Sequence, residues 1–181
     1  QCETNDRCTI FLNGSKIAAS TTVLQLQAGV NYRIKLEARS LNGNPKYRLQ
    51  WKQPNSTSFS VIPAYNLLHD VVCDANPCVH GCCVGPNKCL CEQGHSGADC
   101  SVPIGNCSAS ASPLSTAAEL VAGGLNAKYY SDSNFGTVAV TRIDSLIDFD
   151  WGYSSPALNV PDDFFSITWT GYLRAGNTGW F

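Results

Sequence analysis

The spacing of the cysteines constrains this chain more than any other feature of its sequence. The chain has 10 cysteines in 181 residues, and eight of them lie between residues 73 and 107. A stretch this short and polar cannot bury enough apolar surface to fold without cross-links. An even cysteine number at this density is typical of disulfide bonds formed in an oxidising compartment. We therefore expect a disulfide-held module in the middle of a secreted, extracellular chain.

Potential sugar-attachment sites agree with this location. Asn13, Asn55 and Asn106 each begin an N-glycosylation sequon without proline at the middle position. Serine and threonine also gather around Pro113, a composition that often carries O-linked sugar and otherwise forms a plain flexible linker. The O-linked candidates are Ser108, Ser110, Ser112, Ser115 and Thr116. The sequence predicts a glycoprotein that carries N-linked glycans.

The charge balance excludes several classes of partner. The formal net charge is −2 and only 14% of the residues are charged, so no basic stripe is available for nucleic acid or anionic membrane. No apolar run approaches the roughly 18 residues that a membrane span needs. The chain has no methionine and begins with Gln1, without a signal-peptide pattern. We expect a mature product or an excerpt of a longer chain.

Alternating apolar and polar residues predict β-strands. Residues 32–39 put Tyr, Ile, Leu and Ala on one face and charged residues on the other, and residues 47–51 repeat the pattern. The turn chemistry of residues 42–45 between them predicts an antiparallel hairpin. A second hairpin is predicted around Asn13–Gly14, and another strand over 166–170. The sequence therefore predicts an all-β fold.

The cysteine block resembles an EGF-like module. Its spacing is Cys73-x4-Cys78-x4-Cys83-x5-Cys89-x-Cys91-x8-Cys100, with two glycines in the last loop. The resemblance implies the pairs Cys73–Cys83, Cys78–Cys89 and Cys91–Cys100. Calcium-binding members carry acidic residues before the first cysteine, and Asp70 alone is too little, so no calcium is expected there.

The remaining cysteines leave some pairings open. Cys82 is extra to the EGF-like pattern, and a bond to Cys107 is the economical interpretation; exchanging the roles of Cys82 and Cys83 is the alternative. Cys2 and Cys8 are expected to bridge each other. A zinc site that includes His80 or His95 requires free thiolates, which an oxidising compartment disfavours.

A second resemblance covers the end of the chain. The segments GLNAKYYSDSNF, TRIDSLIDFDWG and SPALNVPDDFFSITWTGYL resemble the first half of the protective-antigen (PA-fourteen) domain family, a β-sandwich. The residues that carry it are Gly124, Tyr130, Phe135, Arg142, residues 147–151, Pro156, Phe164, Trp169 and Gly171. The resemblance stops halfway through the domain, at Trp180–Phe181.

The start of the chain resembles the missing second half. CETNDRCTIFLNG fits the family's acidic loop and the strand after it, and LQAGVNYRIKLEARS and YRLQWKQPNSTSFSVIPAYNLL fit the closing strands. The predicted organisation is the second half-domain at 1–68, the EGF-like module with an extra disulfide at 69–107, a Ser/Ala-rich connector at 108–124 and the first half-domain at 125–181. A half-sandwich would expose an apolar face and an open edge, so something must complete it.

Three completions are open. The chain is permuted and closes on itself, or its halves are completed head to tail by the next molecule, or the 181 residues are one repeat of a longer chain. Because termini rarely interrupt a strand, the sequence favours the repeat. In the last two cases the contact propagates and builds a filament from copies of the same unit.

Candidate chemistry is sparse. Sugar-binding members of the PA-fourteen family hold calcium on an Asp-Asp pair. The matching positions in this sequence are Asn5 and Asp6, which are the candidate calcium ligands. The favoured interpretation is a disulfide-tied turn without an ion. Asp148, Asp150 and the Asp162–Asp163 pair are expected to be capping and turn groups, although two carboxylates can hydrolyse glycosides. The sequence has no nucleophile elbow and no phosphate-binding loop, so no catalytic residue, no enzyme activity and no other cofactor is predicted.

These observations predict an extracellular structural glycoprotein, the repeat unit of a filament or surface stalk assembled head to tail. The first alternative is a calcium-dependent carbohydrate-binding adhesin module. The second alternative is an accessory module of a secreted glycosidase, whose catalytic domain would lie elsewhere.

Overall fold

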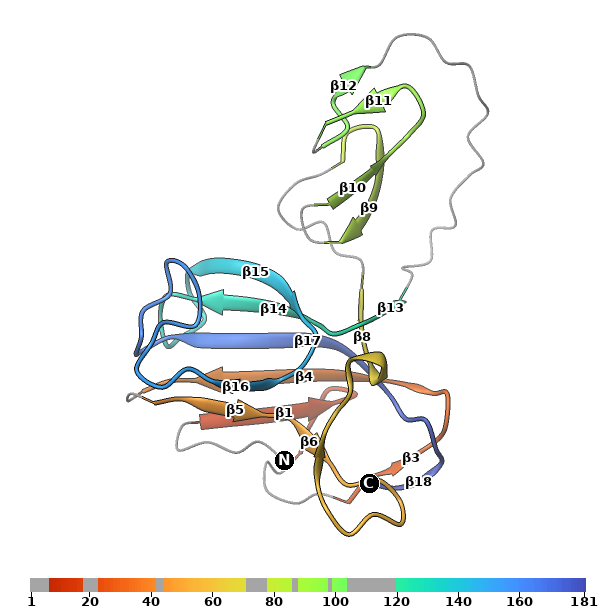
Figure 1. The fold of residues 1–181 in the computed structure, drawn as a ribbon, viewed down its shortest axis with the longest axis vertical. Coiled ribbons are helices and arrows are strands. Elements are labelled where there is room, and N and C mark those ends of the chain that lie inside the picture. Colours follow the sequence, from red (N-terminus) through yellow and green to blue (C-terminus); the bar gives the residue numbers. More distant parts are fainter. Residues whose placement is uncertain are drawn as a thin grey trace. The chain divides into compact units, whose positions relative to one another are not determined.

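The computed structural model describes residues 7–17, 23–41, 44–70, 78–85, 88–97, 99–103 and 120–181. The chain divides into two compact units, which Figure 1 shows coloured along the sequence. Unit 1 combines both ends of the chain, Gln1–His69 and Ala122–Phe181, and unit 2 is Asp70–Val121. Every regular element among the described residues is a β-strand except one short 3-10 turn, η1 (Ala64–Asn66), so the all-β prediction is confirmed.

Unit 1 is built on one large antiparallel sheet. Along its main path the order is β13-β8-β17-β4-β1-β2, and β14 also pairs with β17 and with β15. These strands are β1 (Arg7–Leu12), β2 (Ser15–Ile17), β4 (Asn31–Arg39), β8 (Leu67–Asp70), β13 (Leu120–Ala122), β14 (Leu125–Tyr130), β15 (Val138–Asp144) and β17 (Ser166–Arg174). Figure 1 shows β14, β17, β4 and β1 side by side.

Short strand pairs cover one face of this sheet. They are β5 (Lys46–Arg48) with β16 (Asp148–Asp150), β3 (Gln25–Leu26) with β18 (Gly179–Trp180), and β6 (Gln50–Trp51) with β7 (Ser60–Val61). Aromatic rings join the two layers, because Trp169 of the large sheet lies 6.1 Å from Tyr47 of β5 and 6.2 Å from Phe149 of β16, measured between ring centroids. The layers therefore share one hydrophobic core.

The alternation in β4 explains why it is a central strand. Ile34, Leu36 and Ala38 point into the core and are at most 3% exposed, whereas Arg33 and Lys35, at alternate positions, are exposed. Successive side chains of a strand point to opposite faces, so this pattern leaves one face for the core and one for solvent. The predicted strand over 32–39 and its buried face are confirmed.

The predicted hairpin between residues 32–39 and 47–51 is wrong. Both edges of β4 are occupied, by β1 on one side and β17 on the other, and β5 pairs with β16 in the covering layer. The two segments predicted to pair therefore lie in different layers, β4 in the large sheet and β5 in the covering layer. The hairpin predicted at Asn13–Gly14 is confirmed, because β1 and β2 pair with Leu12 opposite Ser15.

Unit 2 consists of two small ribbons. β9 (Gly81–Gly85) pairs with β10 (Lys88–Cys91), and β11 (His95–Ser96) pairs with β12 (Val102–Pro103). Among its described residues no helix occurs. In the described part of the whole chain, no helix has the length and apolar character needed to cross a membrane.

The chain leaves and re-enters unit 1 at neighbouring positions. The backbone N–H groups of Gly123 and Gly124 both donate to the carbonyl oxygen of Leu67, at 3.0 and 3.1 Å, and β13 pairs with β8. Unit 2 is therefore an insertion between two adjacent strands of one sheet. Residues 120–124, the last part of the predicted connector, take part in this pairing.

Candidate functional site at the junction of the two end segments

The longest strand pairing among the described residues joins two segments that unit 2 separates in the sequence. We call residues 7–69 the leading segment and residues 122–181 the trailing segment. β17 of the trailing segment pairs with β4 of the leading segment over nine positions, from Ser166 opposite Arg39 to Arg174 opposite Asn31. Its other edge pairs with β14 of its own segment. A strand of one segment thus lies between strands of both.

The inward side of this junction is the centre of the core. Trp169 stands opposite Leu36 and Ile167 opposite Ala38, and all four side chains are fully buried. Burying a large apolar side chain contributes about 1.5–3 kcal/mol. Each segment alone would leave these surfaces in water, so the two segments depend on each other for their core.

A second contact between the leading and trailing segments lies in the covering layer and contains charged side chains. In the register of β5 and β16, Lys46 faces Asp150 and Arg48 faces Asp148. Lys46 Nζ lies 2.7 Å from Asp150 Oδ2, and Arg48 Nε donates to Asp148 Oδ1 at 2.6 Å. The pKa of Asp150 lies below its usual range, chiefly because of the hydrogen bond from Lys46.

The prediction that Asp148 and Asp150 are capping and turn groups is wrong for Asp148, a strand residue that pairs with Arg48. It is confirmed for Asp150, whose Oδ1 accepts from the backbone N–H of Gly152 at 3.3 Å in the turn that follows, in addition to the ion pair with Lys46. Their arrangement suits recognition between strands rather than acid–base catalysis. The signal was present in the sequence, because Lys46-Tyr47-Arg48 and Asp148-Phe149-Asp150 both alternate charge, aromatic and charge, with opposite signs.

The sequence did not predict a third contact between the leading and trailing segments. β18 pairs with β3, and Phe181 and Leu24 exchange two backbone hydrogen bonds, at 2.9 and 3.0 Å. The ring of Phe181 lies 5.3 Å from that of Trp51. A Cβ atom at Gly179 would lie 2.5 Å from Pro54 Cγ, so this approach requires glycine. No pattern among neighbouring residues of the sequence predicts contacts between residues so far apart in the chain.

A buried polar cluster fixes the orientation of Trp169. The Asp144 carboxylate accepts hydrogen bonds from Trp169 Nε1 at 2.7 Å, from the Tyr129 hydroxyl at 2.6 Å and from Arg142 Nε at 2.6 Å. Burial, and next the Asp144 charge, raise the pKa of Tyr129 well above its usual value. All four residues belong to the trailing segment, and their hydrogen bonds serve the core.

No metal centre is formed within the part of the chain that the structure describes, where no group of three or more His, Cys, Asp or Glu side chains is placed to hold an ion. The candidate calcium ligands Asn5 and Asp6 lie outside the described residues. Asp132 has a structural role: it accepts backbone hydrogen bonds from Asn134, Gly136 and Thr137. The same bonds lower the pKa of its carboxyl group.

Two of the predicted glycosylation sites are described. Asn13 and Asn55 are both exposed and lie in turns with positive φ, 49° and 66°. Asn13 Oδ1 accepts from the backbone N–H of Arg33 at 2.9 Å. An N-linked glycan is attached through Nδ2, so this bond is compatible with attachment. The other candidates, Asn106, Ser108, Ser110, Ser112, Ser115 and Thr116, lie outside the described residues.

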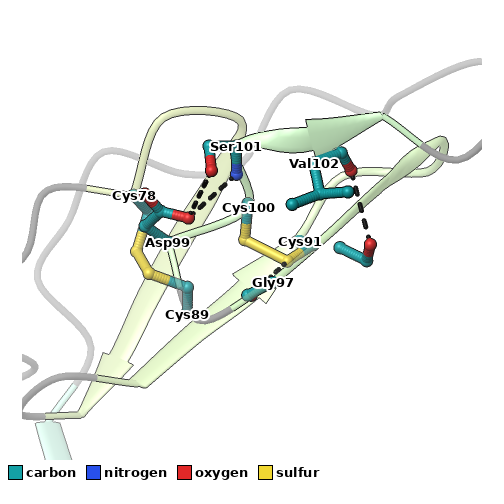
Figure 2. Close-up of a disulfide and its surroundings, with 9 residues drawn as sticks. Cys78, Cys89, Cys91, Gly97, Asp99, Cys100, Ser101 and Val102 are labelled. Carbon is teal, nitrogen blue, oxygen red and sulfur yellow. Dashed lines mark hydrogen bonds between the residues drawn. A yellow bond between two sulfur atoms is a disulfide. The ribbon is translucent and has the colours of Figure 1, made fainter.

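Disulfides hold unit 2 together. Cys78 is bonded to Cys89 and Cys91 to Cys100 (Figure 2). These are two of the three pairs that the EGF-like resemblance implies. Beside them, Asp99 Oδ1 accepts from both the N–H and the hydroxyl of Ser101, at 3.1 and 2.7 Å. Figure 2 shows these groups close to the two disulfides.

The other predicted pairs are only partly described. Cys8 is disulfide-bonded, and Cys2, its predicted partner, lies outside the described residues. Cys73 and Cys107 also lie outside them. Cys82 and Cys83 are described in their backbone alone, as residues of β9. The alternatives for Cys82 and Cys83 therefore stay predictions.

Comparison with known proteins identifies part of unit 1. Anti-sigma-I factor RsgI3 of Acetivibrio thermocellus is 39% identical to this chain over 51 residues, which are 28% of the chain and 8% of that relative. The chain thus spans only a small part of this relative. No solved structure matches the chain significantly. Residues 122–180 match the PA14 domain family, so the trailing segment carries a PA14 domain.

Proposed function

We propose that this chain is the repeat unit of an extracellular, glycosylated filament or stalk, assembled head to tail by completion of a split β-sandwich. In this proposal the leading segment is the second half of a PA14-like domain, and the trailing segment of one copy completes the leading segment of the next. Unit 2 is an EGF-like spacer between the two halves. The same pairings also close one chain on itself, and the two arrangements use identical contacts, as in domain swapping.

The position of β17 carries the proposal. It belongs to the trailing segment and lies between β4 and β14, with Trp169 and Ile167 fully buried against leading-segment residues. Neither segment can cover its apolar face without the other. If the two segments of one copy do not pair with each other, each must therefore pair with the complementary segment of another copy. An exposed face of this kind is not tolerated by a soluble protein.

The separation of the two segments supports exchange between copies. Between the end of β8 at Asp70 and the start of β13 at Leu120, the chain contains a cysteine-rich module and a stretch rich in serine and alanine. A long connection between the two segments allows the trailing segment to pair either within its own chain or with another copy. The disulfides and the sequons support an oxidising, extracellular setting for the filament.

Engineered cross-linking across the junction tests the proposal. Lys35 and Thr170 stand opposite each other in β4 and β17, and both side chains are exposed. Directly opposite residues of antiparallel strands lie within the range that a disulfide spans. One variant carries Lys35→Cys and the other carries Thr170→Cys, and the two are mixed during refolding and oxidation.

Exchange between copies predicts a covalent dimer in the mixture and a ladder of multimers from a chain that carries both substitutions, resolved on a non-reducing gel. A closed chain predicts an internal cross-link without any change in mass, and this result would overturn the proposal. The control is the pair Lys35→Cys with Gly176→Cys, which are not opposite in the sheet. The reduced and deglycosylated mass of native material then separates a tandem-repeat chain from separate subunits of 19.5 kDa.

A further inference from the structure

Opposite charges face each other where the two segments meet in the covering layer. Both cations, Lys46 and Arg48, stand on β5 of the leading segment, and both anions, Asp148 and Asp150, stand on β16 of the trailing segment. The distribution is asymmetric: each segment presents one sign. Two leading strands or two trailing strands placed side by side would therefore repel each other.

The register makes this arrangement specific. Tyr47 and Phe149 face each other between the two ion pairs and point into the core, where Tyr47 is fully buried. A slip of β5 by one residue against β16 would turn Tyr47 toward solvent and bring a charged side chain of β5 into the core. Charge and register thus favour the same alignment.

The ion pairs are exposed, and this decides what they can do. The side chains are 54% and 56% exposed in the pair Lys46–Asp150, and 44% and 38% exposed in the pair Arg48–Asp148. Exposed ion pairs add little to stability. Complementary surface charges instead select the correct partner and increase the rate of association, in a manner that salt screens.

We infer that β5 and β16 form a charge-matched recognition pair that directs the trailing segment of one copy to the leading segment of another. The partner is a second copy of this chain, and the selectivity comes from repulsion between like segments as well as attraction between unlike ones. This inference rests on the proposed head-to-tail function.

Charge reversal tests the inference. The first variant carries Lys46→Glu and Arg48→Glu, so both of its strands are anionic. The second carries Asp148→Lys and Asp150→Lys, so both of its strands are cationic. Each variant alone is expected to assemble about tenfold more weakly than the native chain, because two attractive pairs become repulsive. Light scattering and electron microscopy at low salt measure the assembly.

Mixing the two variants supplies the decisive measurement. In the mixture every anionic strand can meet a cationic strand on the other variant, so assembly is expected to recover as an alternating copolymer. A chain that carries all four reversals is the control for folding, and it is expected to assemble with itself and not with native chains. High salt is expected to reduce the differences among all the variants.

The outcomes separate the two proposals. If native chains assemble and each reversed variant assembles equally well at low salt, the charge inference is overturned and the head-to-tail function stands. If native chains stay monomeric and mixing rescues neither assembly nor the melting temperature of the reversed variants, both proposals are overturned. Recovery on mixing supports both.

Discussion

The two units of this chain are stabilised by different physics. Unit 1 has a core of large side chains, with Trp169, Tyr47, Tyr129 and Phe165 fully buried. In unit 2, where the described side chains are fewer, Cys100 is the buried hydrophobic residue, and disulfides join Cys78 to Cys89 and Cys91 to Cys100. Burial needs a chain long enough to enclose a core, and short modules use covalent links instead. Damage to one unit should therefore leave the other intact.

Removing the largest buried ring should produce the largest effect. We expect Trp169→Ala to lower the free energy of unfolding of unit 1 by about 3–5 kcal/mol, because it leaves a cavity and removes the hydrogen bond to Asp144. Urea unfolding measures the loss, and hydrogen exchange of unit 2 peptides should be unchanged. The control, Trp180→Ala, removes a ring that is 61% exposed and should cost little. Equal losses from both substitutions would contradict the assignment of the core.

Removing one disulfide should destabilise unit 2 and leave unit 1 unchanged, the reverse of the effect expected for Trp169→Ala. Replacing Cys91 and Cys100 together with serine should destabilise unit 2 by about 2–4 kcal/mol, because the unfolded loop regains its freedom. Amide protection in residues 88–103 should fall, while the unfolding transition of unit 1 keeps its midpoint. If protection in unit 2 survives this double substitution, packing rather than the disulfide holds the module.

A single methyl group at the junction should have an intermediate effect. A Cβ atom at Gly171 would collide with the carbonyl oxygen of Leu68, whereas one at Gly176 meets nothing within 4 Å. We expect Gly171→Ala to destabilise unit 1 by about 1–3 kcal/mol through overpacking. Gly176→Ala is the matched control and should be close to neutral. Thermal unfolding measures both, and a neutral Gly171→Ala would show that β17 and β8 do not approach so closely.

Alkaline pH should weaken unit 1 alone. Because the pKa of Tyr129 is raised in the folded state, its contribution is complete below its ordinary value of 10.0 and is lost as the pH rises above that value. Tyr129→Phe should cost about 1–2 kcal/mol at neutral pH through the lost hydrogen bond to Asp144. The difference between native and variant should shrink above about pH 10. Urea titrations at several pH values measure it, and a constant difference would contradict this role of Tyr129.

Local patterns in the sequence predicted where strands lie, but they did not predict reliably which strands pair with one another. The alternation of residues 32–39 predicted a strand and its buried face, and Asn13–Gly14 predicted a hairpin, because both depend on neighbouring residues. The partner of β4 on its far edge is β17, more than 120 residues away. Turn chemistry alone cannot indicate such a partner, and the predicted hairpin with residues 47–51 failed for that reason.

The candidate site shows the same division. Asp148 and Asp150 were noticed as a pair of carboxylates, but their role depends on Lys46 and Arg48 in a distant strand. The resemblance of the cysteine block to an EGF-like module, by contrast, implied the pairs Cys78–Cys89 and Cys91–Cys100, and both bonds are present. Long-range contacts become predictable only when two complementary patterns are compared, as the alternating charges of β5 and β16 allow.

The close approach of Leu67 to Gly123 and Gly124 has a consequence for how such chains diversify. The chain leaves the sheet at Leu67 and re-enters it at Gly123 and Gly124, which are hydrogen-bonded to Leu67. The sheet therefore places one requirement on an inserted segment, that its first and last residues lie close together. The entropy of closing a loop grows only with the logarithm of its length, about 0.6 kcal/mol for each doubling. Inserted modules of very different size are therefore compatible with an unchanged sheet, and the length of the insertion can vary independently of the junction.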